Sequence, residues 1–98
     1  MVMKARKSFI VIAYDISDNR RRYRVTKALK QYGTAINMSV FECMLTDSQF
    51  EKLRIKLEKL INSESDKIVY YPICLHCFTK IVYQPEKINR NASITTVI

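Results

Sequence analysis

One acid, Asp15, ends the apolar run FIVIAYD and is the first residue of this sequence for which chemistry suggests itself. It falls where an expected strand gives way to an expected helix, and aspartate is common in such turns, so a purely structural role is one interpretation. The other is a magnesium ligand, because one carboxylate with waters and a phosphate oxygen makes an ordinary Mg²⁺ site. Tyr14, which precedes it, either stacks on a base, orients a phosphate or packs in the core.

Three consecutive arginines, Arg20, Arg21 and Arg22, follow within a few residues and open the helix pattern. A helix N-terminus carries partial positive charge, so cations there are unfavourable unless an anion occupies the site. Exposed backbone N–H groups and guanidinium groups together form a ready phosphate site. A solvated charged face is the alternative. The same helix continues a sequence-independent track for a nucleic-acid backbone with Arg24, Lys27 and Lys30.

The segment CLHC places Cys74 and Cys77 in a C-x-x-C motif with His76 inside it. Zinc takes four ligands, and the chain has no second C-x-x-C. A redox motif is expected at a helix N-terminus in a βαβ unit, whereas this motif follows a strand and a proline. We therefore expect buried structural cysteines. Because His76 is the only histidine, a nuclease mechanism based on histidine has little to draw on.

Length and charge limit the classes of protein to consider. The 98 residues make one domain, and the net charge of +8 implies a polyanionic partner, either nucleic acid or an anionic membrane. The longest apolar run, Phe9 to Tyr14, is too short to span a bilayer or to serve as a secretory signal. With three cysteines, an odd count that argues against a disulfide framework, the chain is expected to be cytoplasmic and without a membrane partner.

The expected elements follow from hydrophobic periodicity. Strands are predicted at 8–14, 35–45, 66–73 and 79–84, and helices at 17–33 and 46–62. Asp18 or Ser17 caps the first helix, although Ser17 could instead contact a phosphate. Thr46 with Gln49 has the spacing of a capping box, and Gly33 stands where a left-handed C-cap belongs. The first helix buries a stripe made of Val25, Ala28, Leu29 and Tyr32.

We interpret this pattern as the order β-α-β-β-α-β, an α+β ferredoxin-like fold with an antiparallel sheet and both helices on one face. The core is expected at about 8–83, and residues 84–98 form a tail whose end, SITTVI, allows a short fifth strand. Two helices cover one sheet face only, yet FIVIAY and IVYYPI are apolar on both faces. We therefore expect a homodimer through the open face, with the tail strand on the partner's sheet edge.

In order and spacing, YDISDNRRRYRV, LKQYG, SVFEC and YYPIC..C resemble the small CRISPR-associated endoribonuclease family, the second of the two proteins central to CRISPR adaptation. The resemblance implies a ferredoxin-like homodimer that works with the CRISPR integrase on the DNA of a new spacer. It also implies a Mg²⁺-dependent nuclease acting on single-stranded RNA or double-stranded DNA. The family's metal-binding aspartate and its neighbouring tyrosine match Asp15 and Tyr14. Its other functional positions match Arg22, Arg24 and Phe41.

One position departs from the family pattern. Many members have a basic residue four positions before the serine of the S-V-F motif, and here that position is Ala35. Contact with nucleic acid from this strand is therefore in question. Two alternatives to an enzyme stay open: a DNA-binding adaptor without catalysis, for which Asp15 is dispensable, and a ribonuclease toxin on a related fold.

Overall fold

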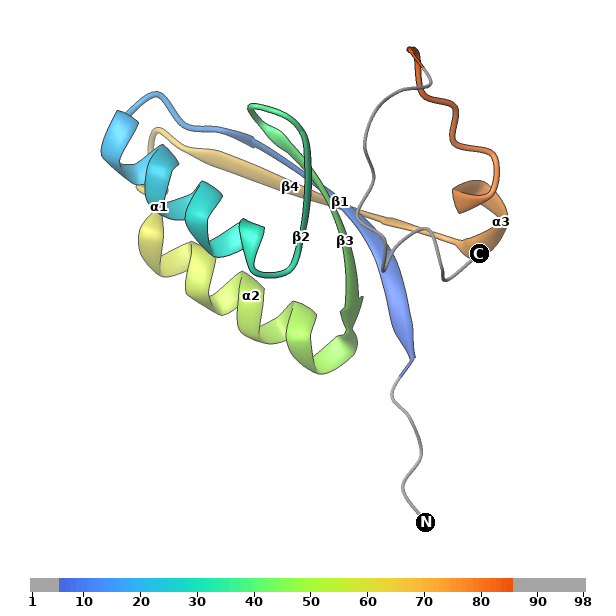
Figure 1. The fold of residues 1–98 in the computed structure, drawn as a ribbon. Coiled ribbons are helices and arrows are strands. Elements are labelled where there is room, and N and C mark those ends of the chain that lie inside the picture. Colours follow the sequence, from blue (N-terminus) through green and yellow to red (C-terminus); the bar gives the residue numbers. More distant parts are fainter. Residues whose placement is uncertain (1–5, 86–98) are drawn as a thin grey trace.

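The computed structural model describes residues 6–85 and places four strands in one antiparallel sheet of order β2-β3-β1-β4. Both long helices lie on the same face of this sheet (Figure 1). The predicted α+β, ferredoxin-like order β-α-β-β-α-β is confirmed. The elements are β1 (Lys7–Asp15), α1 (Asn19–Lys30), β2 (Gly33–Asn37), β3 (Val40–Thr46), α2 (Asp47–Leu60), β4 (Lys67–Ile73) and a short α3 (Leu75–Phe78).

The core lies between the helices and the sheet. Strand β1 alternates, so Ile10, Ile12 and Tyr14 face the helices while their neighbours face the other side. The predicted stripe of α1 is buried at Val25, Ala28 and Leu29, with Tyr32 packed against it at the margin. Helix α2 adds Leu53 and Leu57 to the same core.

The segment 35–45, which was expected as one strand, is in fact a hairpin of two strands. The six segments predicted one by one run β-α-β-α-β-β, so it is this hairpin, and not a strand at 79–84, that completes the order β-α-β-β-α-β. β2 and β3 pair antiparallel around a turn at Met38 and Ser39, with a register shift between Ala35 and Asn37. The Asn37 side chain accepts a hydrogen bond from the Ser39 N–H at 2.9 Å, which is a local turn interaction. The turn lacks glycine and proline, so the segment looked like one strand.

The prediction of a strand at 79–84 was wrong. After β4 the chain enters α3, and the N–H groups of Thr79 and Lys80 bond back to carbonyls of that helix. Phe78 packs on Phe9 across the sheet face away from α1, with ring centroids 4.5 Å apart. Of the apolar residues that suggested a strand, Ile81 packs against this pair, whereas Val82 is exposed. The fifth strand expected in the tail lies outside the described residues.

The predicted helix caps are confirmed except for Gly33. Asp18 accepts from the Arg21 N–H at 2.9 Å, and Thr46 forms both bonds of a capping box with Gln49. Gly33 was expected to end α1 in a left-handed conformation, but it has no positive φ and begins β2 instead. A Cβ at this position would lie 2.2 Å from the Glu42 carbonyl oxygen, so the close approach of β2 to β3 requires glycine.

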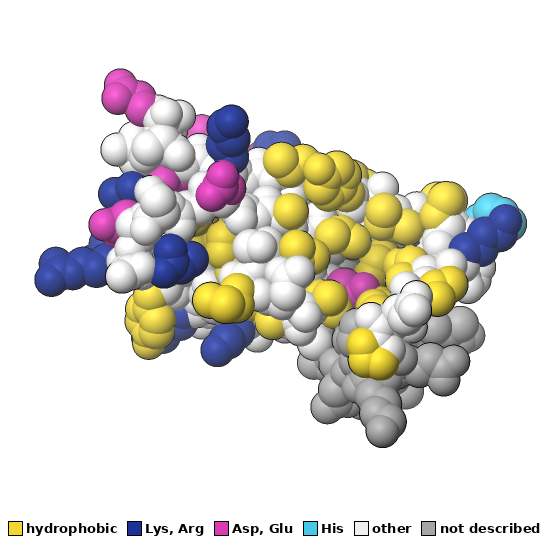
Figure 2. All heavy atoms as spheres, turned by 90° about the horizontal axis from the view of Figure 1, so that it is seen from above, with side chains coloured by type: hydrophobic (Ala, Val, Ile, Leu, Met, Phe, Trp, Pro, Cys, Tyr) yellow, Lys and Arg dark blue, Asp and Glu magenta, His cyan; other side chains and the backbone are white. Residues whose placement is uncertain are grey.

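The sheet face opposite α1 and α2 is largely apolar. Figure 2 shows hydrophobic side chains gathered over this face, in the view from above the sheet. Val69 and Tyr71 of β4 are 44% and 50% exposed, which is unusual for large apolar side chains at the middle of a strand.

Candidate nucleic-acid interface

Asp15 is the last residue of β1 and is exposed. Its neighbour across the β1–β4 ladder is Lys67, the first residue of β4. Within residues 6–85 no group of three or more histidine, cysteine, aspartate or glutamate side chains converges. Mg²⁺ is often held by one or two carboxylates together with substrate phosphates and water. The exposed carboxylate of Asp15 is the type of protein ligand that such a site uses.

Tyr14 is buried, and its ring belongs to the core beside Phe41, with centroids 6.3 Å apart. Its hydroxyl lies 2.8 Å from the Thr26 Oγ1 and donates to the Met38 carbonyl oxygen, also at 2.8 Å. Tyr14 thus ties the end of β1 to α1 and to the β2–β3 turn. Phe41, another predicted contact, is also buried. Both rings therefore pack in the core and are not exposed for contact with nucleic acid.

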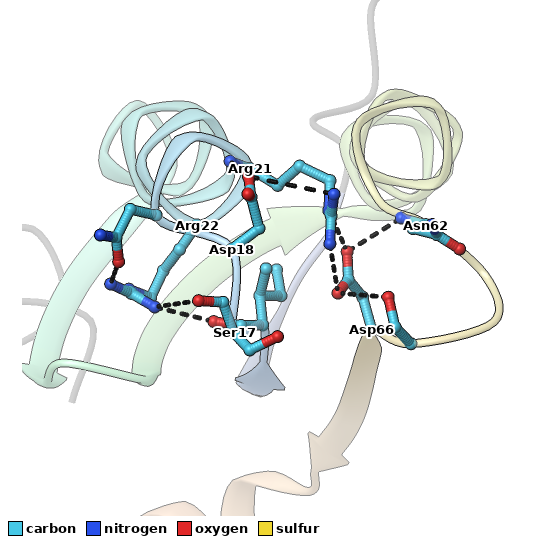
Figure 3. Close-up of polar contacts among 9 residues, drawn as sticks. Ser17, Asp18, Arg21, Arg22, Asn62 and Asp66 are labelled. Atoms are coloured by element: carbon cyan, nitrogen blue, oxygen red, sulfur yellow. Dashed lines mark hydrogen bonds and ion pairs between the residues drawn. The ribbon is translucent and has the colours of Figure 1, made fainter.

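Arg21 points into the protein and pairs with Asp66, the residue just before β4 (Figure 3). Its Nε donates to one carboxylate oxygen at 2.7 Å and its Nη2 to the other at 3.3 Å. The Asp66 side chain is fully buried and also accepts from the Asn62 N–H and the Ser65 hydroxyl. Arg21 and these donors lower the pKa of Asp66, and Asp66 raises the pKa of Arg21.

Arg22 braces the loop between β1 and α1. Its Nη1 donates to the Ile16 carbonyl at 2.9 Å and to the Ser17 carbonyl at 3.3 Å, and its Nη2 donates to Asn19 (Figure 3). A helix that opens on three arginines is therefore stable without a bound anion, because two of them have internal acceptors. Sequence reasoning missed Asp66, which is separated from Arg21 by 45 residues.

The remaining basic side chains of the predicted track are exposed on α1. They are Arg20, Arg24, Lys27 and Lys30. The first turn of this helix contains no acidic residue, and Ser17 before it is also exposed. Ala35 is exposed on the edge strand β2, so the departure from the family pattern falls on the surface. The surface at the start of α1 is therefore positively charged and accessible to a phosphate backbone.

We predict that Asp66→Asn lowers stability at pH 7 and that this deficit shrinks in acid. The pKa of Asp66 is lower in the folded protein than the usual value near 4. Its stabilising contribution is therefore present above about pH 4 and is lost as the pH falls through the folded pKa. Urea unfolding of both proteins at pH 7 and in acid would measure this.

The control for Asp66→Asn is Glu51→Gln, which neutralises the exposed Arg54–Glu51 pair of α2. Such a surface pair contributes little, so this variant should resemble wild type at both pH values. Equal stabilities of Asp66→Asn and wild type at pH 7 would show that the Arg21–Asp66 pair contributes nothing.

The expectation that Cys74 and Cys77 are buried was wrong, because both are exposed. Cys74 caps α3, and its Sγ accepts the Cys77 N–H at 3.4 Å. That bond lowers the pKa of Cys74, while the neighbouring Cys74 side chain raises the pKa of Cys77. Pro72 lies within β4, opposite Ile10, and the strand ends one residue later at Ile73. Burial raises the pKa of the third cysteine, Cys43, to about 12.

Among the described residues, no helix has both the length and the apolar character needed to cross a membrane. The longest of them, α2, has 14 residues with charged side chains on its outer face.

Comparison with known proteins points to one family. A family model described as CRISPR associated protein Cas2 matches residues 8–81. The chain is 44% identical over 71 residues to a CRISPR-associated endoribonuclease Cas2 of Synechocystis sp., covering 72% of this chain and 77% of that protein.

Two solved structures share the fold. The first is Cas2 of Streptococcus pyogenes, with a TM-score of 0.71 at 24% identity, covering 76% of this chain and 96% of that one. The second is a chain of a partial Cas6-RT-Cas1–Cas2 complex, with a TM-score of 0.69 at 20% identity, covering 87% of this chain and 91% of that one.

Proposed function

The chain belongs to the CRISPR associated protein Cas2 family, and on that basis we propose that it is a CRISPR adaptation protein with metal-dependent endoribonuclease activity. The observation that carries the proposal is the exposed carboxylate of Asp15 at a strand end followed by an exposed basic helix start. The Synechocystis relative is named an endoribonuclease, which supports hydrolysis of RNA phosphodiester bonds. Double-stranded DNA is the second substrate to test.

In this proposal Asp15 from each of two copies would hold Mg²⁺, which would stabilise the charge developing on the phosphate and lower the pKa of a bound water. Arg20, Arg24 and Lys27, which are exposed on α1, would bind backbone phosphates of the same nucleic acid. Ser17 is exposed beside them and adds a hydroxyl donor. Tyr14 and Arg22 keep the strand end and the loop in place through their hydrogen bonds.

The active form is a homodimer through the open sheet face. Val69 and Tyr71 are exposed on this face, and the apolar area in Figure 2 is of the kind that marks an interface. A two-fold axis through this face would bring two copies of Asp15 toward one another. Sedimentation should therefore give a dimer, and a stable monomer would remove the shared metal site.

A second candidate function is that of an adaptor without catalysis. It is favoured because Asp15 is the one carboxylate that each copy contributes to the proposed metal site, and because Ala35 stands where many family members have a basic residue. The basic dimer would then bind DNA while contacting the CRISPR integrase. The likeness to a chain of a Cas1–Cas2 complex supports a Cas1-type integrase as partner. Both functions place the protein in the cytoplasm, where exposed free cysteines persist as thiols.

The test is cleavage of labelled single-stranded RNA and duplex DNA by the purified protein with Mg²⁺, with and without EDTA. We expect products with Mg²⁺ and a complete loss of cleavage on chelation, because the proposed mechanism relies on the metal for charge stabilisation and for activating water. Cleavage that persists in EDTA would exclude the metal mechanism. Binding without cleavage under any divalent cation would establish the adaptor.

A further inference from the structure

A shallow hollow of about 310 Å³ lies between one face of α1 and the β2–β3 turn. It is called the Tyr23 hollow here and is lined by Asn19, Arg22, Tyr23, Thr26 and Met38. The four α1 residues are spaced i, i+3, i+4 and i+7, so they form one face of the helix. The volume is at the lower end for ligand sites and suits one flat ring system.

The two largest apolar side chains of the hollow are exposed. Tyr23 is 66% exposed and Met38 is 84% exposed, although both stand beside a packed core. A tyrosine ring offers a flat, rigid surface for a base at a low entropic cost, and a thioether packs well on aromatic rings. Neither side chain is needed to close the core, since Val25 and Leu29 of the same helix are fully buried.

The rest of the hollow is polar and held in position. The Asn19 amide oxygen accepts from Arg22, which leaves its NH₂ group as a donor. Thr26 forms the inner wall, and its hydroxyl is hydrogen-bonded to the Tyr14 hydroxyl. The Tyr14 hydroxyl also donates to the Met38 carbonyl oxygen, which holds the backbone of Met38 in place. An aromatic ring with a few oriented donors is the usual composition of a site for an unstacked base.

The charge around the hollow favours nucleic acid over a protein partner. Tyr23 stands between Arg22 and Arg24 in a helix whose first turn has no acidic residue. A comparable hollow of about 350 Å³ on α2 and β4 contains both Arg54 and Glu58, so its charge is balanced. Unlike that hollow, the Tyr23 hollow combines an exposed aromatic side chain with basic neighbours and no acidic lining residue.

We propose that the Tyr23 hollow binds one unstacked base of a single-stranded nucleic acid whose backbone follows the arginines of α1. This inference rests on the proposed function and adds to it a preference for unpaired substrate. Asp15 succeeds Tyr14 on β1, so its side chain leaves the strand on the opposite face from the hollow. The base contact is therefore independent of the metal and can be measured without it.

The experiment measures fluorescence anisotropy of a labelled oligouridine in EDTA, with Tyr23→Ala as the test variant. Loss of one base–aromatic stack should weaken binding roughly 5- to 100-fold. Tyr23→Phe keeps the ring and should bind like wild type. Ile55→Ala removes an exposed apolar side chain from the other hollow and should have no effect. Thermal melting checks that all variants are folded.

Two further probes separate a base contact from a backbone contact. The first probe is an abasic oligonucleotide of the same length, and the second is a DNA duplex. Tyr23→Ala and wild type should bind each of these probes with equal affinity. Arg24→Ala should weaken binding to every probe and reduce the salt slope by about 0.7 on single strands, whereas Tyr23→Ala leaves the slope unchanged.

The outcomes distinguish the two proposals. Salt-dependent binding with no difference between Tyr23→Ala and wild type on oligouridine overturns the base site alone. The base site is also overturned if Tyr23→Ala weakens binding to the probe without bases as much as binding to oligouridine. It is overturned as well if the only effect of Tyr23→Ala is a change of oligomeric state. Absence of salt-dependent binding by wild type to any probe overturns the proposed function itself.

Discussion

Asp15→Asn should lower metal-dependent cleavage by more than about 100-fold while leaving nucleic-acid binding intact. Loss of a group that only orients a metal ligand costs about 10- to 100-fold, so loss of the ligand itself should cost more. Binding should be kept or slightly strengthened, because the substitution removes a negative charge from a surface that contacts phosphates. Single-turnover cleavage at saturating protein separates the two effects.

The matched control for Asp15→Asn is Asp47→Asn, the same chemical change at an exposed position in the first turn of α2. It should cleave like wild type. If Asp15→Asn cleaves as fast as wild type, Asp15 is not the metal ligand. If neither wild type nor variant cleaves but spacer acquisition proceeds in both, the adaptor function is the correct one.

Gly33→Ala should destabilise the fold by about 3 kcal/mol, at the upper end for overpacking. The new Cβ would lie 2.2 Å from the Glu42 carbonyl oxygen and 2.5 Å from the Cys43 Sγ. The first of these is a backbone atom, so β2 must move away from β3 to relieve the contact. Urea unfolding followed by far-UV circular dichroism would measure the loss.

The control for Gly33→Ala is Ala35→Ser, which adds one atom at an exposed position of the same strand. Such a surface change should alter stability by no more than about 0.5 kcal/mol. A Gly33→Ala protein as stable as wild type would mean that the hairpin shifts at no cost, and that glycine is not required for the approach of the strands.

The elements whose apolar residues recur at a regular helix or strand spacing were predictable from sequence. Strand β1, the stripe of α1 at Val25 and Leu29, and the capping box of Thr46 depend on neighbours within a few residues, and all were confirmed. The hairpin was missed because residues on both sides of the turn are apolar or β-branched and no glycine marks it. Gly33 was misplaced because its role depends on β3, a strand that pairs with it only after folding.

The site was predicted in outline and not in its internal bonding. The sequence shows that three arginines follow Asp15, but not which of them faces outward. Arg21 turns inward because Asp66 is buried just before β4 with no other cation beside it among the described residues. Long-range partners of this kind leave no periodic trace. The exposure of Cys74 and Cys77 was also missed, because α3, which contains the motif, has only four residues and is too short to show a helical period in the sequence.

The hydrogen-bonded ion pair between Arg21 and Asp66 determines at which stage of folding the start of α1 acquires its final geometry. It joins residues 45 positions apart, so the chain must close a long loop and form α2 before the two side chains meet. Loop closure at this separation is entropically costly and comes late in folding. Until then the Arg21 guanidinium lacks its Asp66 partner, whereas the acceptors of Arg22 lie within six residues of it in the sequence. Ordered recognition of nucleic acid, as distinct from the attraction between opposite charges, should therefore arise only in the completed domain.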